Sequence, residues 1–269
     1  MKPKLIEWFE LTQIPFGKEI STKSLFSYPQ LDELYQKLGL AVESNSAALT
    51  TGQAGTGKTT AIRWFLDTLP ANKYRVIYLG NDQDGNSLFA RLGMELGLRL
   101  PAIRNQRLFQ LTQHIQRHVG GAGKQLILVI DEAHLLDGRT LEDIRLLTNS
   151  EMDSRTPVIL FLLGQIWLRS KLKNHGHEAL YQRMRFRFGL EGLTKQQTRE
   201  YISHHLALVG CKKELLTTDA MDYLFMASGG ILREINNLTV DAMLKASNLG
   251  KHRIDEKIVR MVVNERDSA

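Results

Sequence analysis

The chain has 269 residues, and its hydrophobic share of 43% and charged share of 24% are those of a soluble globular protein. Its one cysteine, Cys211, excludes an intramolecular disulfide and favours a reducing compartment. No apolar run approaches the roughly 20 residues of a membrane-spanning helix, and Glu7 and Glu10 interrupt the region where a signal peptide would be apolar. We therefore expect a soluble cytoplasmic protein without a membrane partner.

The formal net charge of +6 gathers in acid-free stretches of the chain. Residues 99–124 contain five Lys or Arg and no acid, and residues 155–177 contain four Lys or Arg and no acid. Basic surfaces of this kind attract the phosphate backbone of nucleic acids. A solvated basic face is the alternative explanation.

The first 30 residues are irregular, with Pro15 and Pro29 as breakers, and a helical spacing of apolar residues follows over 31–42. Five β-rich runs then alternate with helical segments, and we expect strands at "AALTTG" (47–52), "RVIYLG" (75–80), "QLILVID" (125–131), "PVILFLLG" (157–164) and "MRFRFGL" (184–190). Apolar strands separated by helices predict a parallel sheet that is covered on both faces. After Thr194 the remaining patterns are helical and predict a small all-helical domain.

A phosphate-loop motif, "GQAGTGKT", follows the first expected strand. Its glycines let successive backbone N–H groups point at phosphates, and the helix that begins at Lys58 adds the positive end of its dipole. We expect Lys58 to reach the β- and γ-phosphates of ATP and the Thr59 hydroxyl to bind Mg²⁺. The candidate nucleotide contacts are Gly52, Gln53, Ala54, Gly55, Thr56, Gly57, Lys58, Thr59 and Thr60.

The run "LILVIDEAH", residues 126–134, supplies two carboxylates at the end of an apolar strand. We expect Asp131 to hold Mg²⁺ and Glu132 to orient or deprotonate the water that attacks the γ-phosphate. Two solvated acids at a strand end are the alternative, which the upstream phosphate loop disfavours. His134 is expected to be a packing or hydrogen-bonding neighbour. No zinc site is expected, because no other His or Cys has the spacing of metal ligands.

With these two motifs the chain resembles the AAA+ ATPases. It is more closely similar to the branch shared by secretion ATPase A (the ExeA/GspA type) and the transposon ATPases of the TnsC, TniB and MuB type. The resemblance covers nearly the whole chain, and it implies an α/β P-loop fold with a five-stranded parallel sheet and a C-terminal helical lid. The expected boundaries are 1–30 for an N-terminal segment near the nucleotide, 31–193 for the nucleotide-binding domain and 194–269 for the lid.

The resemblance also implies roles outside the two motifs. Gln165, after the fourth expected strand, is at the position of the polar first sensor, which contacts the γ-phosphate or the attacking water. Arg233 in "GGILREINNL" is at the position of the second sensor, which reaches the nucleotide from the lid. The run "FELTQIPFGKEI" is similar to the segment of this branch that lies against the adenine, and a packing role for its aromatic residue is the alternative. The candidate base contacts in it are Ile14, Pro15 and Phe16.

The arginine finger of the family enters the site of a neighbouring subunit and precedes the fifth strand. Arg183 matches its position best, and Arg185 and Arg187 are the alternatives. A finger supplied by a neighbour implies an ATP-dependent homo-oligomer, either a ring or a helical filament. In such assemblies the segments after the second strand face the central channel, and here these are residues 81–87 and 99–117.

The second channel segment is basic, and its three arginines are expected to follow the phosphate backbone of double-stranded DNA with little sequence preference. Lys171 and Lys173 are the alternative DNA surface. Aromatic residues make up 7% of the chain and are not interleaved with the basic residues, which argues weakly against a platform that stacks single-stranded bases. The three arginines are Arg99, Arg104 and Arg107.

Together these expectations predict a DNA-binding ATPase that regulates transposition. It would assemble on target DNA with ATP, recruit or activate a transposase with or without a target-selection protein, and be released when ATP is hydrolysed. The alternatives are a secretion-type ATPase A that acts in the assembly of an envelope machine, and a loader of replication proteins. Transposition is preferred because of the basic stretches, and because the chain ends at Ala269, before the membrane-spanning and peptidoglycan-binding regions of the secretion ATPases.

Overall fold

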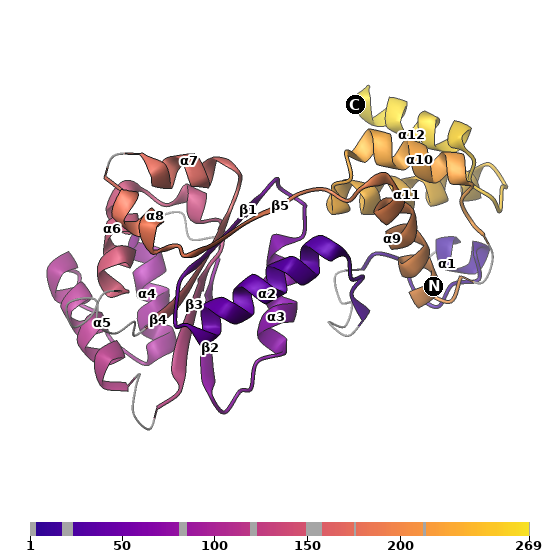
Figure 1. Cartoon of the computed structure of the whole chain (residues 1–269). Coiled ribbons are helices and arrows are strands. Elements are labelled where there is room, and N and C mark those ends of the chain that lie inside the picture. Colours follow the sequence, from indigo (N-terminus) through magenta and orange to yellow (C-terminus); the bar gives the residue numbers. More distant parts are fainter. Residues whose placement is uncertain are drawn as a thin grey trace. The chain divides into compact units, whose positions relative to one another are not determined.

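The computed structural model of the chain (Figure 1) describes residues 4–17, 24–80, 85–118, 123–148, 158–174, 176–211 and 214–268. The chain forms two compact units. Unit 1 comprises Met1–Tyr28, Gly55–Gly57 and Glu191–Ala269, and unit 2 comprises Pro29–Ala54 and Lys58–Leu190.

Unit 2 is built on a five-stranded parallel sheet with the strand order β2-β3-β4-β1-β5. Each strand overlaps a run predicted from the sequence, so the predicted α/β fold is confirmed. In the sheet, β1 lies between β4 and β5, although it precedes both in the chain. The strands are β1 (Ala48–Gly52), β2 (Tyr74–Leu79), β3 (Gln125–Ile130), β4 (Val158–Gly164) and β5 (Phe186–Leu190).

Helices alternate with these strands and cover the sheet. The α2 helix packs on β1 and β5, and α3 packs on β1, while side chains of α4 to α8 form the layer on the other face. The six-residue α8 was not predicted, because it is too short for a periodic apolar pattern. The helices are α2 (Pro29–Glu43), α3 (Lys58–Asp67), α4 (Gly85–Leu96), α5 (Arg104–His118), the 3₁₀ turn η2 (Ala133–Leu135), α6 (Gly138–Leu147), α7 (Trp167–Lys173) and α8 (Glu178–Arg183).

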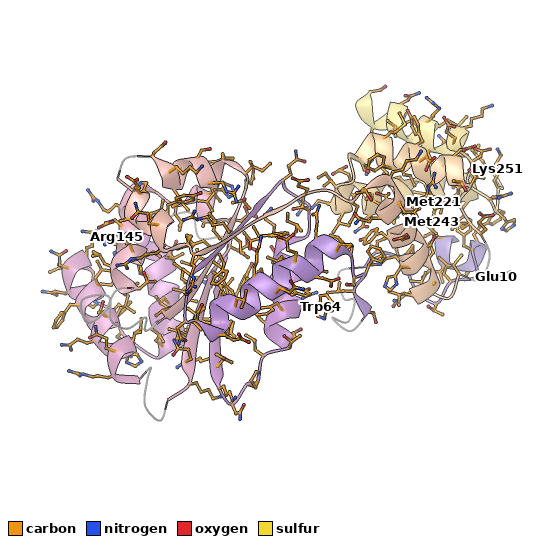
Figure 2. The ribbon with its side chains drawn as sticks, in the orientation of Figure 1. Glu10, Trp64, Arg145, Met221, Met243 and Lys251 are labelled. Carbon is orange, nitrogen blue, oxygen red and sulfur yellow. The ribbon has the colours of Figure 1, made fainter. Side chains whose placement is uncertain are left out.

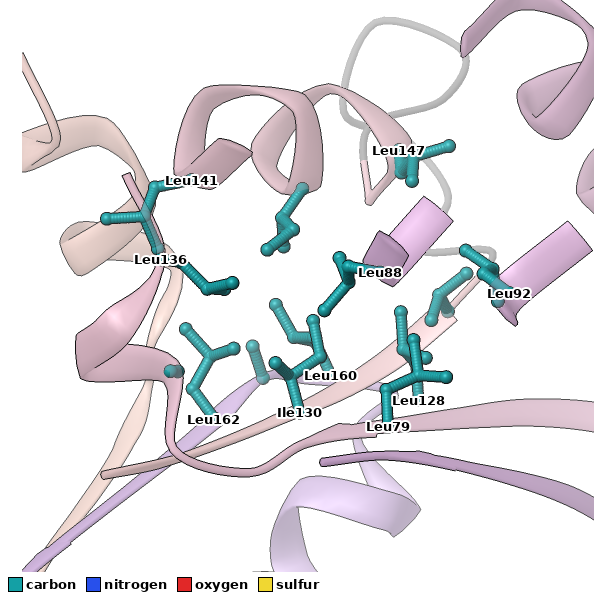
Figure 3. Close-up of a cluster of buried hydrophobic side chains, with 14 of the residues drawn as sticks. Leu79, Leu88, Leu92, Leu128, Ile130, Leu136, Leu141, Leu147, Leu160 and Leu162 are labelled. Carbon is teal, nitrogen blue, oxygen red and sulfur yellow. The ribbon is translucent and has the colours of Figure 1, made fainter. Parts of the chain in front are cut away.

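A buried apolar cluster joins the sheet to helices α4 to α8 (Figure 3). Ile130 of β3, Leu88 of α4 and Leu141 of α6 all contribute to it. Every residue of β4 is buried, as expected for a central strand of a parallel sheet. The edge strand β2 differs, because its Val76 and Tyr78 are 40% and 44% exposed. The prediction of two covered faces therefore does not hold for β2.

Unit 1 contains the predicted C-terminal helical region, which is confirmed. Side chains fix several helix starts: Thr194 forms a capping box with Gln197, and Asp255 accepts from the third residue of its helix. The core includes Met243, which is fully buried (Figure 2). The helices are α1 (Lys4–Trp8), α9 (Lys195–Leu208), α10 (Thr218–Ser228), α11 (Leu232–Asn248) and α12 (Glu256–Asp267).

The N-terminal segment is part of unit 1. The Trp8 ring stacks on His252 with ring centroids 4.4 Å apart, and its indole N–H donates to the Lys251 carbonyl. Further along, the Thr12 N–H donates to the Val209 carbonyl at 2.9 Å. These contacts tie the segment to the C-terminal helices. Within the described ranges, no helix combines the length and apolar character that a bilayer crossing requires.

Candidate functional site

Three parallel strands of unit 2 bring the predicted motifs to one edge of the sheet. Strands β1, β3 and β4 end at Gly52, Ile130 and Gly164. The phosphate loop follows β1, the two carboxylates follow β3, and Gln165 follows β4. Because the carboxyl ends of parallel strands share one edge, these groups lie where open α/β sheets bind their ligands.

The ammonium group of Lys58 lies inside the phosphate loop. It donates to the Gly52 carbonyl at 3.0 Å and to the Gln53 carbonyl at 2.8 Å, and the side chain is buried. Lys58 is also the first residue of α3, so the helix begins where the motif ends. The chain therefore presents a cation and a helix N-terminus at the same point, as phosphate binding requires.

The centre of the phosphate loop packs within unit 1. The Gly55 carbonyl accepts from the Arg233 N–H at 3.1 Å, at the start of α11. Both central glycines have positive φ, 85° at Gly55 and 89° at Gly57. A Cβ at Gly55 would lie 2.8 Å from Arg233 Cβ, and one at Gly57 would lie 2.9 Å from Leu232 Cδ1. Backbone conformation and packing thus both demand glycine here.

The carboxylate of Asp131 is held by three donors. Its Oδ2 accepts from the Thr59 hydroxyl at 2.5 Å and from the Tyr78 hydroxyl at 2.8 Å, and its Oδ1 accepts from the Glu132 N–H at 2.8 Å. The predicted metal ligands Thr59 and Asp131 are therefore in direct contact. Burial, and next the hydrogen bond to Asp131, raise the pKa of the Tyr78 hydroxyl, which stays protonated and acts as a donor.

Tyr78 was missed in the sequence because no motif marks it. The sheet register supplies the signal: Tyr78 on β2 pairs with Val129 on β3, two residues before Asp131. Because side chains alternate along strands, Tyr78 and Asp131 project to the same side of the sheet. Only the strand pairing reveals this neighbour.

Glu132 lies beside His134 at the end of β3. Glu132 adopts the left-handed conformation with φ 53°, which is uncommon for a residue other than glycine. Its Oε2 is 3.3 Å from His134 Nδ1, and the Gln165 N–H donates to the same nitrogen at 3.3 Å. Burial lowers the pKa of His134, which the charge of Glu132 partly opposes. His134, the predicted hydrogen-bonding neighbour, thus lies between Glu132 and the end of β4.

The three finger candidates lie at the opposite edge of the sheet, near the amino ends of β1, β4 and β5. There a hollow of about 570 Å³ is lined by Arg183 and Arg185, together with Arg145 of α6, which is labelled in Figure 2. Arg183 donates to the Arg145 carbonyl at 3.1 Å, and Arg185 is exposed. Arg187 instead donates to the Tyr181 carbonyl at 2.8 Å, and its guanidinium lies over the Tyr181 ring.

Three of the five predicted DNA contacts make hydrogen bonds within unit 2. Arg104 forms a bidentate salt bridge with the buried carboxylate of Asp143. Arg107 is buried and donates to Asn86 Oδ1 at 3.0 Å. The Lys171 ammonium donates to the His134 carbonyl at 3.0 Å, and burial lowers its pKa.

These three cations bond to other residues of unit 2, although the Arg104 side chain is 38% exposed, and their contacts with DNA stay predictions. Arg99 and Lys173 are exposed and remain predicted contacts. Residues 81–84 of the predicted channel loop lie outside the described residues.

The predicted base contacts of the N-terminal segment pack within unit 1. The Phe16 ring lies 5.1 Å from the His205 ring and 6.0 Å from the Tyr201 ring, both on α9. Pro15 is buried and Ile14 is exposed. The packing alternative for Phe16 is thus observed, and the contact with adenine remains a prediction.

The sheet, the phosphate loop at its carboxyl edge and the adjacent acidic pair define a P-loop nucleoside triphosphatase. Residues 42–172 match the family model described as "AAA domain". The chain therefore has the AAA+ ATPase fold and is an ATPase, which confirms the predicted fold and activity.

One curated relative is General secretion pathway protein A of Aeromonas hydrophila, which is 32% identical to this chain over 253 residues. The match covers 92% of this chain and 46% of that protein, so the chain spans less than half of its relative's length. The predicted similarity to the transposon ATPases stays a prediction.

Two solved structures are similar in fold. Cdc6p of Pyrobaculum aerophilum gives a TM-score of 0.68 at 16% identity, over 97% of this chain and 70% of that chain. The ORC1 protein of Aeropyrum pernix, solved in complex with DNA, gives 0.66 at 17% identity, over 90% of this chain and 66% of that chain. At these identities the similarity concerns the fold alone.

Proposed function

We propose that the chain is the ATPase module of a secretion-type ATPase A, which hydrolyses ATP as a homo-oligomer in a general secretion pathway. The observation that carries this proposal is the 32% identity, over 92% of the chain, with General secretion pathway protein A. We prefer it to the transposition hypothesis because this identity is with a secretion protein. In addition, three of the five predicted DNA contacts, Arg104, Arg107 and Lys171, make hydrogen bonds within unit 2.

The donor set at the carboxyl edge fits Mg²⁺ bound with ATP. Thr59 Oγ1 and Asp131 Oδ2 are 2.5 Å apart, and oxygen atoms of this kind are the ligands that Mg²⁺ prefers. When bound, the ion would neutralise charge on the phosphate oxygens. Tyr78 keeps the Asp131 carboxylate in place through its hydroxyl.

The remaining side chains have distinct proposed roles. Lys58 binds the β- and γ-phosphates, and Glu132 accepts a proton from the attacking water. Gln165 orients that water or contacts the γ-phosphate. Arg233 keeps its predicted role as the second sensor, with Pro15 and Phe16 as predicted base contacts. The loop from Gly52 to Thr60 supplies backbone N–H groups to the phosphates.

The finger candidates support an oligomer. Arg183 and Arg185 line a hollow at the amino edge of the sheet, whereas the phosphate loop follows the carboxyl edge of β1. A side chain at one edge does not reach a nucleotide at the other edge of its own sheet. We therefore propose that a second copy supplies the arginine, as in a ring or filament.

Turnover and assembly test the proposal together. ATP hydrolysis and sedimentation are measured with and without random-sequence duplex DNA, at low and moderate salt. The secretion proposal expects ATP-dependent assembly and turnover that duplex DNA changes by less than about twofold. Strong stimulation by DNA would contradict it.

A chimera tests the pathway directly. This chain replaces the matching region of the Aeromonas hydrophila protein, and protein secretion is measured. The matched control carries Glu132→Gln, which should fold and bind ATP but fail to support secretion. An active ATPase chimera that leaves secretion at the control level would argue against the pathway.

The second candidate is a DNA-bound regulator of transposition or a replication loader. The net charge of +6 and the exposed Arg99 and Lys173 favour it. For this candidate, duplex DNA stimulates turnover, and replacing both residues by alanine lowers the slope of log affinity against log salt by about two, or about one per lost phosphate contact. A transposase pull-down then separates the regulator from the loader.

A further inference from the structure

The Nδ1 atom of His134 lies near both a hydrogen-bond donor and a hydrogen-bond acceptor. His134 Nδ1 is 3.3 Å from the Gln165 backbone nitrogen, which donates a hydrogen bond to it, and 3.3 Å from Glu132 Oε2. The Gln165 N–H can only donate, and the Glu132 carboxylate can only accept. A single imidazole nitrogen either accepts or donates, so His134 Nδ1 satisfies one of these partners at a time.

The ring is held in this position from several sides. His134 is 3% exposed, and its ring meets Trp167 edge to face with centroids 4.7 Å apart. Its carbonyl accepts from the Lys171 ammonium at 3.0 Å. A Cβ at Gly164, the last residue of β4, would lie 2.7 Å from Leu168 Cδ2 and 3.3 Å from the His134 backbone nitrogen. The glycine therefore lets the end of β4 pack closely against Leu168 and the backbone of His134.

Glu132 is fixed from its own backbone as well. Its φ of 53° lies in the left-handed region, and its N–H donates to Asp131 Oδ1 at 2.8 Å. The carboxylate is 37% exposed and lies at the rim of the site beside His134. Strained backbone of this kind persists where the surroundings determine it, and it recurs at active sites.

We propose that His134 is a positioning residue for ATP hydrolysis, whose Nδ1 alternates between the Gln165 N–H and the Glu132 carboxylate. With its proton on Nδ1, the ring holds the carboxylate. With Nδ1 unprotonated, the ring binds the end of β4 and leaves the carboxylate to the attacking water. The orientation of the base is thereby linked to Gln165. This inference rests on the role proposed above for Glu132.

The test compares variants of the full chain that differ in one property at a time. His134→Phe keeps an aromatic ring against Trp167 but removes Nδ1. His134→Asn places an amide oxygen or nitrogen near the position of Nδ1. Trp167→Leu is the packing control, because it removes the ring contact and leaves His134 intact. For each variant, kcat and KM for ATP, the melting temperature and the Kd of a non-hydrolysable ATP analogue with Mg²⁺ are measured.

We expect His134→Phe to lower kcat by about tenfold or more, with Kd within about twofold of wild type. His134→Asn should recover most of the rate, and Trp167→Leu, which loosens the ring but keeps Nδ1, should lower kcat less than His134→Phe does. In a Glu132→Gln background, His134→Phe should cause no further loss in single-turnover reactions, because the group that it positions is already absent.

Three results would overturn the inference: an unchanged or raised kcat in His134→Phe, a fall in affinity that matches the fall in kcat, or an undiminished further loss in the Glu132→Gln background. Wild-type turnover in Glu132→Gln alone would mean instead that the role proposed for Glu132 is wrong.

Discussion

The two edges of the sheet in unit 2 differ in how they hold their functional groups. At the carboxyl edge, Lys58 and Asp131 are buried, and each is bound by neighbouring donors or acceptors. At the amino edge, Arg183 and Arg185 line an open hollow, and Arg185 is exposed. The carboxyl edge holds its charged groups in a fixed geometry, whereas at the amino edge Arg185 is exposed and Arg183 is half-buried, bonded to the Arg145 carbonyl.

This difference supports the proposed division of the ATPase site between subunits. Binding of the nucleotide and activation of water need groups fixed in advance, since preorganised charges stabilise a transition state without a cost of rearrangement. A group that acts on another subunit must instead be exposed until that subunit arrives. We therefore expect variants of residues at the carboxyl edge to lose ATP turnover in their own subunit. A variant that lacks the arginine at the amino edge should regain turnover when it is mixed with subunits that carry the arginine.

The largest effect is expected for Lys58→Ala. The buried ammonium is the cation of the phosphate loop, and its loss should weaken ATP binding by about 100-fold and abolish both turnover and ATP-dependent assembly. Binding of a fluorescent ATP analogue and sedimentation measure this. Lys37→Ala, in an ion pair with Glu33 on α2, is the matched control and should behave as wild type.

The next effect concerns Arg183→Ala, which should lower kcat on the order of 1,000-fold while ATP binding stays intact. Mixing it with Glu132→Gln should restore turnover, because each variant supplies the group that the other lacks. If the mixture does not recover turnover, the arginine does not act on a neighbouring subunit, and the proposed division of roles between the two edges is wrong. Arg185→Ala and Arg187→Ala, measured in parallel, decide which of the three arginines acts.

Glu132→Gln should lower kcat by about 100-fold or more and leave ATP affinity nearly unchanged, because only the proton acceptor is lost. The ATP-bound assembly should then accumulate in sedimentation experiments. Turnover at the wild-type rate would exclude Glu132 as the base. A loss of affinity equal to the loss of rate would mean that the carboxylate holds the site together instead.

The smallest effect is expected for Tyr78→Phe, which removes one of the three donors to Asp131 and keeps the ring. The Mg²⁺ concentration for half-maximal turnover should rise by about threefold, with kcat at saturating Mg²⁺ within about twofold. A Mg²⁺ titration of turnover and of nucleotide binding measures this. Val76→Ala, at an exposed position on the same strand, is the control.

Part of this site was predictable because it is contiguous in the chain. The phosphate loop needs glycines, a lysine and a threonine at fixed spacing on one turn, and Asp131 and Glu132 directly follow an apolar strand. The same local reasoning predicted the five strands and the C-terminal helices, since periodicity is a property of neighbouring residues.

Other features depend on which distant residues meet. Arg104 and Arg107 both belong to an acid-free basic stretch of the sequence. In the structure Arg104 forms an ion pair with Asp143, and Arg107 donates a hydrogen bond to Asn86. Their partners lie 39 and 21 residues away in the chain, and no spacing rule connects them. A basic stretch is therefore weak evidence for a surface until its partners are known.

The sequence by itself determined the class of chemistry: a phosphate loop and an acidic pair after an apolar strand predict an ATPase, because each motif is built from adjacent residues. The tertiary structure decided which side chains support it. Tyr78 reaches Asp131 because β2 pairs with β3, and Gln165 reaches His134 because β4 lies on the other side of β3. Strand order sets both contacts, and strand order is decided by packing of the whole sheet, which residue spacing does not contain.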